Sequence, residues 1–297
     1  MSFEQPLVSI VIPTYNHAHL LRRALTSVIR QTYGNWEATV VDNYSHDSTE
    51  EVISEFRDGR IKLVKFRNHG VIAASRNVGL RQSNGEWIAF LDSDDWWTHD
   101  KLQSCLDAAS ADTNLVYHDM EIVGAKSLGI FKRKIKSRQL GSRATIDLLV
   151  NGNPIATSSV LVRKRLLESV GGMNESPAMT AAEDYHTWLL MSRQPGQFKY
   201  LAKGLGYYLV HAQGVSQKDM SGPMRAAVSD FLPLLDKRER RTAFARILYA
   251  RVRSRFLGGR HAAVMHHLCY CIRFGDSEIR FKALAMALAL TVKKTKK

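Results

Sequence analysis

The chain has 297 residues, an ordinary composition for a globular protein and a formal net charge of +14. Its three cysteines form neither a metal-ligand motif nor a redox motif, and no apolar run reaches the roughly 18 residues of a membrane-spanning helix. Because the first residues also lack a basic segment and a long apolar run, we expect a cytoplasmic protein without a signal peptide.

The positive charge is concentrated at one end of the chain. Residues 221–297 contain 17 lysines and arginines against 5 acidic residues, a net charge of +12, and this leaves only +2 for residues 1–220. The turn-forming sequence Ser221-Gly222-Pro223 coincides with the shift in charge. We therefore predict a domain over residues 1–220 and a basic helical region over residues 221–297.

Predicted strands and helices alternate through the first ninety residues. Short apolar runs predict strands, and apolar residues at helical spacing predict the helices between them. The strands are expected at 7–12, 36–41, 61–66 and 87–91, and the helices at 19–30, 48–56 and 72–82. This alternation is typical of an α/β fold with a mostly parallel sheet flanked by helices.

The rest of the chain gives a less regular pattern. Further strands are predicted at 114–118, 158–162 and 206–210, and helices at 163–170 and 181–191. The segment 126–143 is rich in basic residues without a clear period, which indicates a hairpin or loop.

Polar residues follow three of the predicted strands, where open parallel sheets bind their ligands. Thr14 follows the first strand and Asp42 the second, and FLDSDDWW, residues 90–97, places three aspartates at the end of the fourth. Crowded carboxylates repel one another unless a cation lies between them, and oxygen ligands in an Asp-x-Asp arrangement suit Mg²⁺ or Mn²⁺. The alternative is that Asp92 or Ser93 caps a following helix.

Several motifs carry a family resemblance. The segments IVIPTYNHAHLLRRALTSVIRQTY, VVDNYSHDSTEEVI, ASRNVGL, GEWIAFLDSDDWW and SSVLVRKRLLESVGGMNES…AEDYHTWLLMSR occur in this order. Together they resemble the family 2 glycosyltransferases, whose Rossmann-like GT-A fold binds nucleotide sugars. The likeness spans about residues 7–215. It implies a nucleotide-sugar half over residues 1–104 and an acceptor half over residues 105–220.

The resemblance implies a metal-dependent, inverting transfer of one sugar. Asp94 matches the acid that holds Mn²⁺ or Mg²⁺ at the donor diphosphate, and Asp92 the acid that contacts the ribose or the metal. His211 lies where some relatives place a histidine that reaches the metal, although a lone histidine is more often structural. Asp95 is expected behind these ligands.

The same resemblance outlines the nucleotide site. Asp42 matches the acid that reads the pyrimidine edge, which favours UDP and leaves dTDP open, and Arg76 matches a basic contact to the nucleotide. Asn43 and Tyr44 depart from the family pattern Asp-Asp-Gly-Ser. The full set of predicted nucleotide-sugar contacts is Pro13, Thr14, Tyr15, Asp42, Arg76, Asp92 and Ser93.

Glu183 and Asp184 match an acidic pair at a helix start. The resemblance implies that Asp184 is the base that takes the proton of the acceptor hydroxyl and that Glu183 lies beside it. The alternative is that both acids merely suit the helix dipole. Trp96, Trp97 and Ser158 are expected at the acceptor pocket, with core packing as the alternative for the tryptophans.

The basic region suggests where the acceptor is found. Aromatic and apolar residues alternate with basic clusters in residues 221–297, and the apolar run 281–292 is too short to span a bilayer. Such helices suit an anionic membrane surface and hence a lipid-linked or glycan acceptor in cell-surface polysaccharide synthesis. Ordinary solvated helices are the alternative. A nucleic-acid partner is not expected, because no nucleic-acid motif occurs.

Three other functions are alternatives to the predicted glycosyltransferase activity. A nucleotidyltransferase would open with a glycine-rich phosphate loop, whereas PTYNHAHL after the first strand has no glycine. A non-catalytic nucleotide-sugar-binding module has only the Asn43-Tyr44 departure in its favour. A processive polysaccharide synthase would carry spanning helices, and the sequence predicts none.

Overall fold

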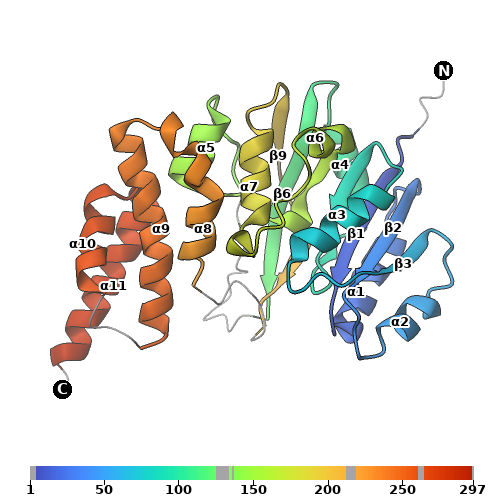
Figure 1. The fold of residues 1–297 in the computed structure, drawn as a ribbon, viewed down its shortest axis with the longest axis horizontal. Helices are drawn as coiled ribbons and strands as arrows, with labels where there is room; N and C mark the ends of the chain where they lie inside the picture. Colours follow the sequence, from blue (N-terminus) through green and yellow to red (C-terminus); the bar gives the residue numbers. More distant parts are fainter. Residues whose placement is uncertain (1–4, 125–133, 136, 212–218, 260–263, 296–297) are drawn as a thin grey trace. The chain divides into compact units, whose positions relative to one another are not determined.

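The computed structural model describes residues 5–124, 134–135, 137–211, 219–259 and 264–295 (Figure 1). Contacts within the chain define two compact units, and each is described by itself. The first comprises Met1–Leu140, Pro154–Pro177 and Leu190–His211, and the second comprises Gly141–Asn153, Ala178–Leu189 and Ala212–Lys297. The predicted division at residue 220 stays a prediction. Half of the segment predicted as a basic hairpin, residues 126–133 and 136, lies outside the described residues.

The first unit is built on one sheet, which contains nine strands among the described residues. The strand order is β3-β2-β1-β4-β8-β6-β9-β5, and β7 pairs with β6. The strands are β1 (Val8–Thr14), β2 (Trp36–Asp42), β3 (Ile61–Lys65), β4 (Trp87–Phe90), β5 (Trp96–Trp97), β6 (Thr113–Val123), β7 (Lys134–Ile135), β8 (Leu161–Arg163) and β9 (Gln197–Leu209). The first four pair in parallel, as predicted, whereas β8 runs antiparallel to β4 and β6.

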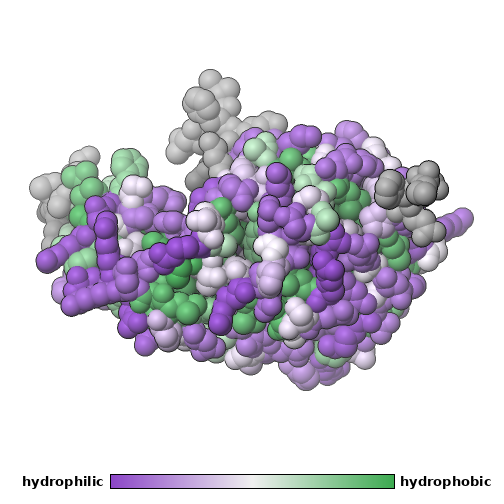
Figure 2. Space-filling model, turned by 90° about the horizontal axis from the view of Figure 1, so that it is seen from above, coloured by the Kyte–Doolittle hydropathy of each residue, from purple (hydrophilic) through white to green (hydrophobic). Residues whose placement is uncertain are grey.

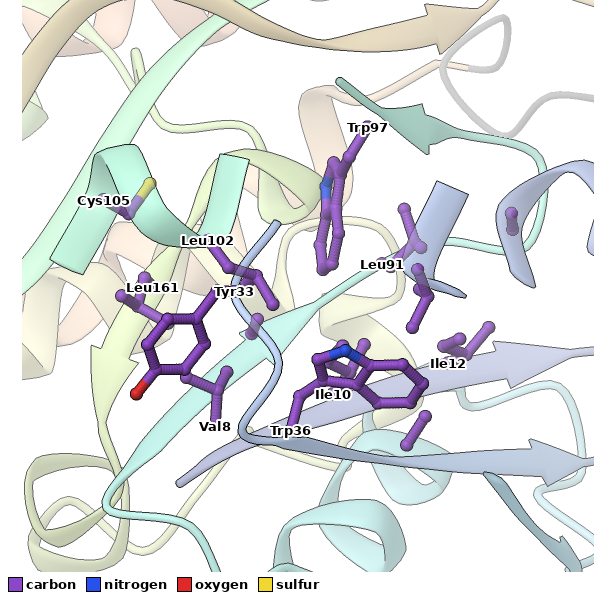
Figure 3. Packing of buried hydrophobic residues seen from close by; sticks show 14 of the residues in the cluster. Val8, Ile10, Ile12, Tyr33, Trp36, Leu91, Trp97, Leu102, Cys105 and Leu161 are labelled. Atoms are coloured by element: carbon purple, nitrogen blue, oxygen red, sulfur yellow. The ribbon is translucent and has the colours of Figure 1, made fainter. Parts of the chain in front are cut away.

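Helices cover both faces of this sheet. They are α1 (Ala18–Ile29), α2 (Thr49–Glu55), α3 (Ile72–Gln82), α4 (Lys101–Ala108) and α6 (Lys164–Ser169), with a 3-10 turn, η1 (Thr157–Ser159). Alternate residues of β1 belong to one core with α1 and α4, and Figure 3 shows Val8, Ile10 and Ile12 on that side together with Leu102. Val11 points the other way, against Gly79 of α3. Burial on both faces explains why the first strands are continuous apolar runs.

The structure refines two predicted strands. β1 continues through Pro13 to Thr14, and beyond Val11 it pairs with β2 alone. Because β4 no longer pairs with β1 at Pro13, the missing N–H of the proline costs no hydrogen bond to β4. The strand predicted at 158–162 is instead the 3-10 turn η1 followed by the three-residue β8. Ser158 therefore lies in a turn.

The second unit is helical. It contains α5 (Ala144–Asn151), α8 (Ser221–Val228), the 3-10 helix η4 (Ser229–Leu234), α9 (Lys237–Leu257), α10 (Met265–Phe274) and α11 (Ser277–Thr295). Two further elements lie partly in this unit, namely the 3-10 helix η2 (Pro177–Met179) and α7 (Glu183–Met191). These elements confirm the predicted helices of the C-terminal region. A capping box fixes the start of α9, where Asp236 accepts hydrogen bonds from the first-turn amides and Glu239 accepts one from the Asp236 amide. Over the described residues, no helix has the length and apolar character needed to cross a bilayer.

Candidate active site

The polar strand ends predicted from the sequence meet at one edge of the first unit's sheet. Because β1, β2 and β4 are parallel neighbours, Thr14 pairs with Asp42 in register, and the segment 91–95 leaves β4 beside them. The helix-cap alternative for Asp92 and Ser93 is wrong, since Trp96–Trp97 forms β5 and the next helix begins only at Lys101.

Asp92 is held from two sides. Its Oδ1 lies 2.6 Å from Nη2 of Arg76, whose side chain is only 4% exposed. The Asp92 amide donates a hydrogen bond to the Ser158 hydroxyl, 3.1 Å away. Arg76 of α3 therefore fixes the direction of the Asp92 carboxylate, and Ser158 of η1 fixes the Asp92 backbone.

Asp94 meets a histidine from the far end of the first unit. Nε2 of His211, two residues beyond the end of β9, lies 2.9 Å from Oδ2 of Asp94. The structure thus brings together the two residues that the family resemblance placed at the metal, although 117 positions separate them.

A second histidine, missed by the sequence analysis, lies beside this pair. Nδ1 of His17 is 3.1 Å from the Ser93 hydroxyl, and its ring meets the His211 ring edge-on with the centroids 5.8 Å apart. Burial lowers the pKa of His17, and the negative charge of Asp94 opposes that shift. Because burial favours the neutral form of the ring, His17 can offer one donor and one acceptor.

Asp95 has a different environment from the other two aspartates. It is 1% exposed, its Oδ1 accepts a hydrogen bond from the Leu209 amide, and its Oδ2 has no partner among the described residues. Burial, reinforced by the charges of Asp92 and Asp94, raises the pKa of Asp95 well above its usual range. Asp95 therefore supports the β9 end from behind the other carboxylates.

The ends of β1 and β2 form the neighbouring part of the edge. Asp42 is 1% exposed, and both of its carboxylate oxygens accept hydrogen bonds from Ser45, which closes a tight turn after β2. Pro13 and Thr14 are buried beside it, and the Thr14 hydroxyl has no hydrogen-bond partner among the described residues. A buried hydroxyl without a partner is costly unless a ligand supplies one.

Two tyrosine rings stand exposed at the same strand ends. Tyr15 is 49% exposed and Tyr44 is 43% exposed, and the Arg67 guanidinium lies 5.1 Å from the centroid of the Tyr44 ring. Tyr44, one of the departures from the family pattern, has a φ of +56°, a left-handed conformation that side chains rarely adopt. The loop after β2 thus presents this ring outward at some conformational cost.

The two tryptophans have separate environments. Trp96 stacks on Tyr207 at 4.9 Å between ring centroids, and the Arg23 guanidinium lies 3.5 Å from the Trp96 ring. Trp97 is 3% exposed within the main core, and its indole N–H donates to the Ser158 carbonyl at 2.7 Å. The role of these residues at an acceptor pocket stays a prediction.

Glu183 and Asp184 belong to the second unit, in the first turn of α7. Glu183 is 3% exposed, whereas Asp184 is half-buried and its Oδ1 accepts a hydrogen bond from the Tyr185 amide. The Tyr185 hydroxyl donates to the Leu148 carbonyl at 2.8 Å, which ties α7 to α5. This bond anchors the start of α7, which carries Asp184.

The donor set of the first unit fits a divalent cation that is shared with a substrate. Among the described residues, no three His, Cys, Asp or Glu side chains gather as a ready-made metal cage. Asp94 and His211 nevertheless present an oxygen and a nitrogen at one point. Because Mg²⁺ and Mn²⁺ commonly bind one or two protein ligands and complete their shell with phosphate oxygens and water, this pair is sufficient.

Comparison with known proteins assigns the family. The model of Glycosyl transferase family 2 matches residues 9–171, more than half of the chain. The chain therefore belongs to the family 2 glycosyltransferases, which are transferase enzymes. It is 33% identical over 184 residues to the Escherichia coli protein named UDP-Glc:alpha-D-GlcNAc-diphosphoundecaprenol beta-1,3-glucosyltransferase WfgD, a match that covers 62% of this chain and 68% of WfgD.

Solved structures show the same fold. A structure of residues 1–349 of S. aureus TarS in complex with UDP-GlcNAc superposes with a TM-score of 0.66 at 20% identity, covering 90% of this chain and 80% of that one. The mannosyltransferase PcManGT from Pyrobaculum calidifontis, solved with GDP-Man and Mn²⁺, superposes with a TM-score of 0.61 at 18% identity, covering 98% of this chain and 81% of the other. Together with the family match, these similarities establish the predicted GT-A fold.

Proposed function

We propose that the protein transfers one sugar from a nucleoside diphosphate sugar to a hydroxyl group of a glycan or lipid-linked acceptor, with inversion at the anomeric carbon. The observation that carries this proposal is the cluster at the carboxyl edge of the sheet, where Arg76 holds Asp92 and His211 meets Asp94. Two carboxylates, a guanidinium and an imidazole at this edge suit a diphosphate with its divalent cation.

UDP is the nucleotide favoured by this proposal. WfgD is named for UDP-Glc, and the TarS fragment was solved with UDP-GlcNAc. Asp42 can accept a hydrogen bond from the uracil N3–H if it gives up one of its hydrogen bonds from Ser45. The Thr14 hydroxyl is available to a ligand. The exposed Tyr15 ring can pack on the base.

We assign the diphosphate end of the donor to the residues that follow β4 and to His211. Asp94 and His211 would hold Mn²⁺ or Mg²⁺, and the bound cation would neutralise the charge that the departing diphosphate gains. Asp92, kept in place by Arg76, contacts the ribose, and Ser93 and its partner His17 lie alongside.

The acceptor side completes the reaction. The acceptor oxygen attacks the anomeric carbon, the bond from that carbon to the diphosphate oxygen breaks, and its electron pair leaves with the nucleoside diphosphate. We assign to Asp184 the role of taking the proton of the attacking hydroxyl, and to Glu183 a positioning role beside Asp184. We assign Trp96 to the acceptor pocket, together with Trp97 and Ser158, which are buried and would support that pocket from within the core.

A lipid-linked acceptor agrees with the charge of the chain. The name of WfgD specifies a sugar that is linked to diphosphoundecaprenol. The net charge of +12 over residues 221–297 suits an anionic membrane surface. We therefore place the protein peripherally on the inner face of the plasma membrane, in cell-surface polysaccharide synthesis.

A product assay tests the proposed function. The protein is incubated with Mn²⁺, a panel of UDP-sugars and a short-chain lipid diphosphate-GlcNAc acceptor, and we expect UDP release and a product of opposite anomeric configuration by NMR. Asp184→Asn should lower kcat by about 10²–10⁴-fold while UDP affinity is retained, because only the proton acceptor is lost. Asp107→Asn, an exposed acid of α4, is the matched control and should leave kcat unchanged.

Each alternative function gives a distinct result in the same assay. Release of pyrophosphate instead of UDP would identify a nucleotidyltransferase. UDP binding without turnover of any donor would identify a non-catalytic binding module. Full activity of Asp184→Asn would mean that another group takes the proton.

A further inference from the structure

Helix α11 is apolar on two opposite sides. Its inner side belongs to the core of the C-terminal helices, where Ile279, Ala283 and Leu290 are between 0% and 7% exposed. They pack with residues of α9 and α10, among them Val252 and Leu268. Burial of this side is sufficient to hold α11 in the bundle, so packing within the unit leaves the opposite side unexplained.

The outer side presents a continuous apolar stripe. Phe281 is 75% exposed, Leu284 is 47% exposed and Leu288 is 66% exposed, and Ala285 lies exposed between them. The spacing i, i+3, i+4, i+7 places all four side chains on one side of the helix, opposite to the buried set. Single exposed leucines are common, but a stripe of this kind marks an interaction surface.

Basic residues accompany this stripe. Arg280 and Lys282 flank Phe281, and residues 277–297 contain six lysines and arginines against one glutamate. Figure 2 shows apolar surface interleaved with hydrophilic side chains over the C-terminal helices, at the left of the view. An apolar stripe with a cationic border is the composition of helices that lie in the headgroup region of anionic membranes.

We propose that α11 is the element that docks on an anionic lipid bilayer, with Phe281, Leu284 and Leu288 inserted among the acyl chains near the interface. A second copy of this chain is a poorer occupant, because each C-terminal region carries a net charge of +12 and two such regions repel each other. The inference rests on the proposed function for its purpose, since docking would bring the enzyme to a lipid-linked acceptor.

Vesicle sedimentation tests this proposal. Wild-type protein and the triple variant Phe281→Ser, Leu284→Ser, Leu288→Ser are mixed with vesicles of phosphatidylcholine alone or with added phosphatidylglycerol, at low and high salt. We expect wild type to bind the anionic vesicles at low salt and the variant to bind them at least about tenfold more weakly. Leu234→Ser with Leu257→Ser, two exposed leucines of η4 and α9, is the matched control and should bind like wild type.

Two further measurements separate the possible failures. Circular dichroism and UDP binding of the triple variant should match wild type, because the changed residues are exposed and lie outside the nucleotide site. Equal sedimentation of wild type and triple variant, or a wild-type dimer that the triple variant loses, would overturn the docking proposal and leave the proposed sugar transfer untouched.

Discussion

His211 and His17 show how far single residues of the site can be predicted. Asp92 and Asp94 can be predicted as site residues directly from the sequence, because two acids after a buried strand form a local pattern. His211 was placed near them only by family resemblance, since 117 positions separate it from Asp94. His17 gave no sequence signal, because its approach to Ser93 depends on where the start of α1 packs against the segment after β4.

A buried histidine in β6 makes a prediction about acid stability. His118 is fully buried, and burial, with the nearby Lys101 charge adding to it, lowers its pKa from 6.5 to about 3. Between these two values the unfolded chain binds a proton that the folded protein cannot bind. The free energy of unfolding should therefore fall by about 1.4 kcal/mol for each pH unit below 6.5.

The variant His118→Asn isolates this effect. Asparagine can keep the donation that Nδ1 makes to the Asp119 carbonyl, 2.8 Å away, but it does not titrate. Between pH 7 and pH 4.5, wild type should lose about 2–3 kcal/mol more stability than the variant, measured by urea unfolding at each pH. Parallel pH profiles of the two proteins would show that His118 does not cause the acid sensitivity.

At the scale of elements, the regular strands and helices of the first ninety residues were predictable, and so were β6, α6, α7 and β9 beyond them, whereas the shortest strands were not. Strands β1 to β4 are continuous apolar runs because both faces are covered, and their boundaries shift by two residues at most. β5 and β8 have only two and three residues, which is too short to show any period. Their pairing with β9, and with β4 and β6, decides their conformation.

The packing of α3 on β1 depends on a glycine. A Cβ at Gly79 would lie 2.3 Å from Cγ1 of Val11, well inside contact distance. Gly79→Ala should therefore lower the free energy of unfolding by about 1–3 kcal/mol, in spite of the better helix propensity of alanine. Adding Val11→Ala should restore part of the loss, as measured by chemical denaturation.

Gly222 provides the matched control within α8. No atom other than those of its chain neighbours lies within 4 Å of a Cβ placed there, so Gly222→Ala should change the free energy of unfolding by less than about 1 kcal/mol. If the Gly79 and Gly222 substitutions have the same effect, the close approach of α3 to β1 is not the reason for the glycine.

At the scale of the whole molecule, the clustered aspartates and the excess positive charge lie in different segments of the chain. The aspartates that we assign to the proposed diphosphate site lie in the nearly neutral residues 1–220, whereas the excess positive charge lies in residues 221–297. Charge counting revealed this division from the sequence alone. The contact-defined second unit was not foreseen, because α5 and most of α7 join it from the middle of the chain through tertiary contacts.

We propose above all that the aspartates of FLDSDDWW bind a diphosphate together with a divalent cation. Calorimetric titration with UDP tests this most directly. Wild type and Asp94→Asn are titrated with and without Mn²⁺. We predict that wild type binds UDP more tightly with Mn²⁺ and that Asp94→Asn loses this gain, because asparagine removes the charge that attracts the cation. Mn²⁺-independent UDP binding, equal in the two proteins, would contradict the account.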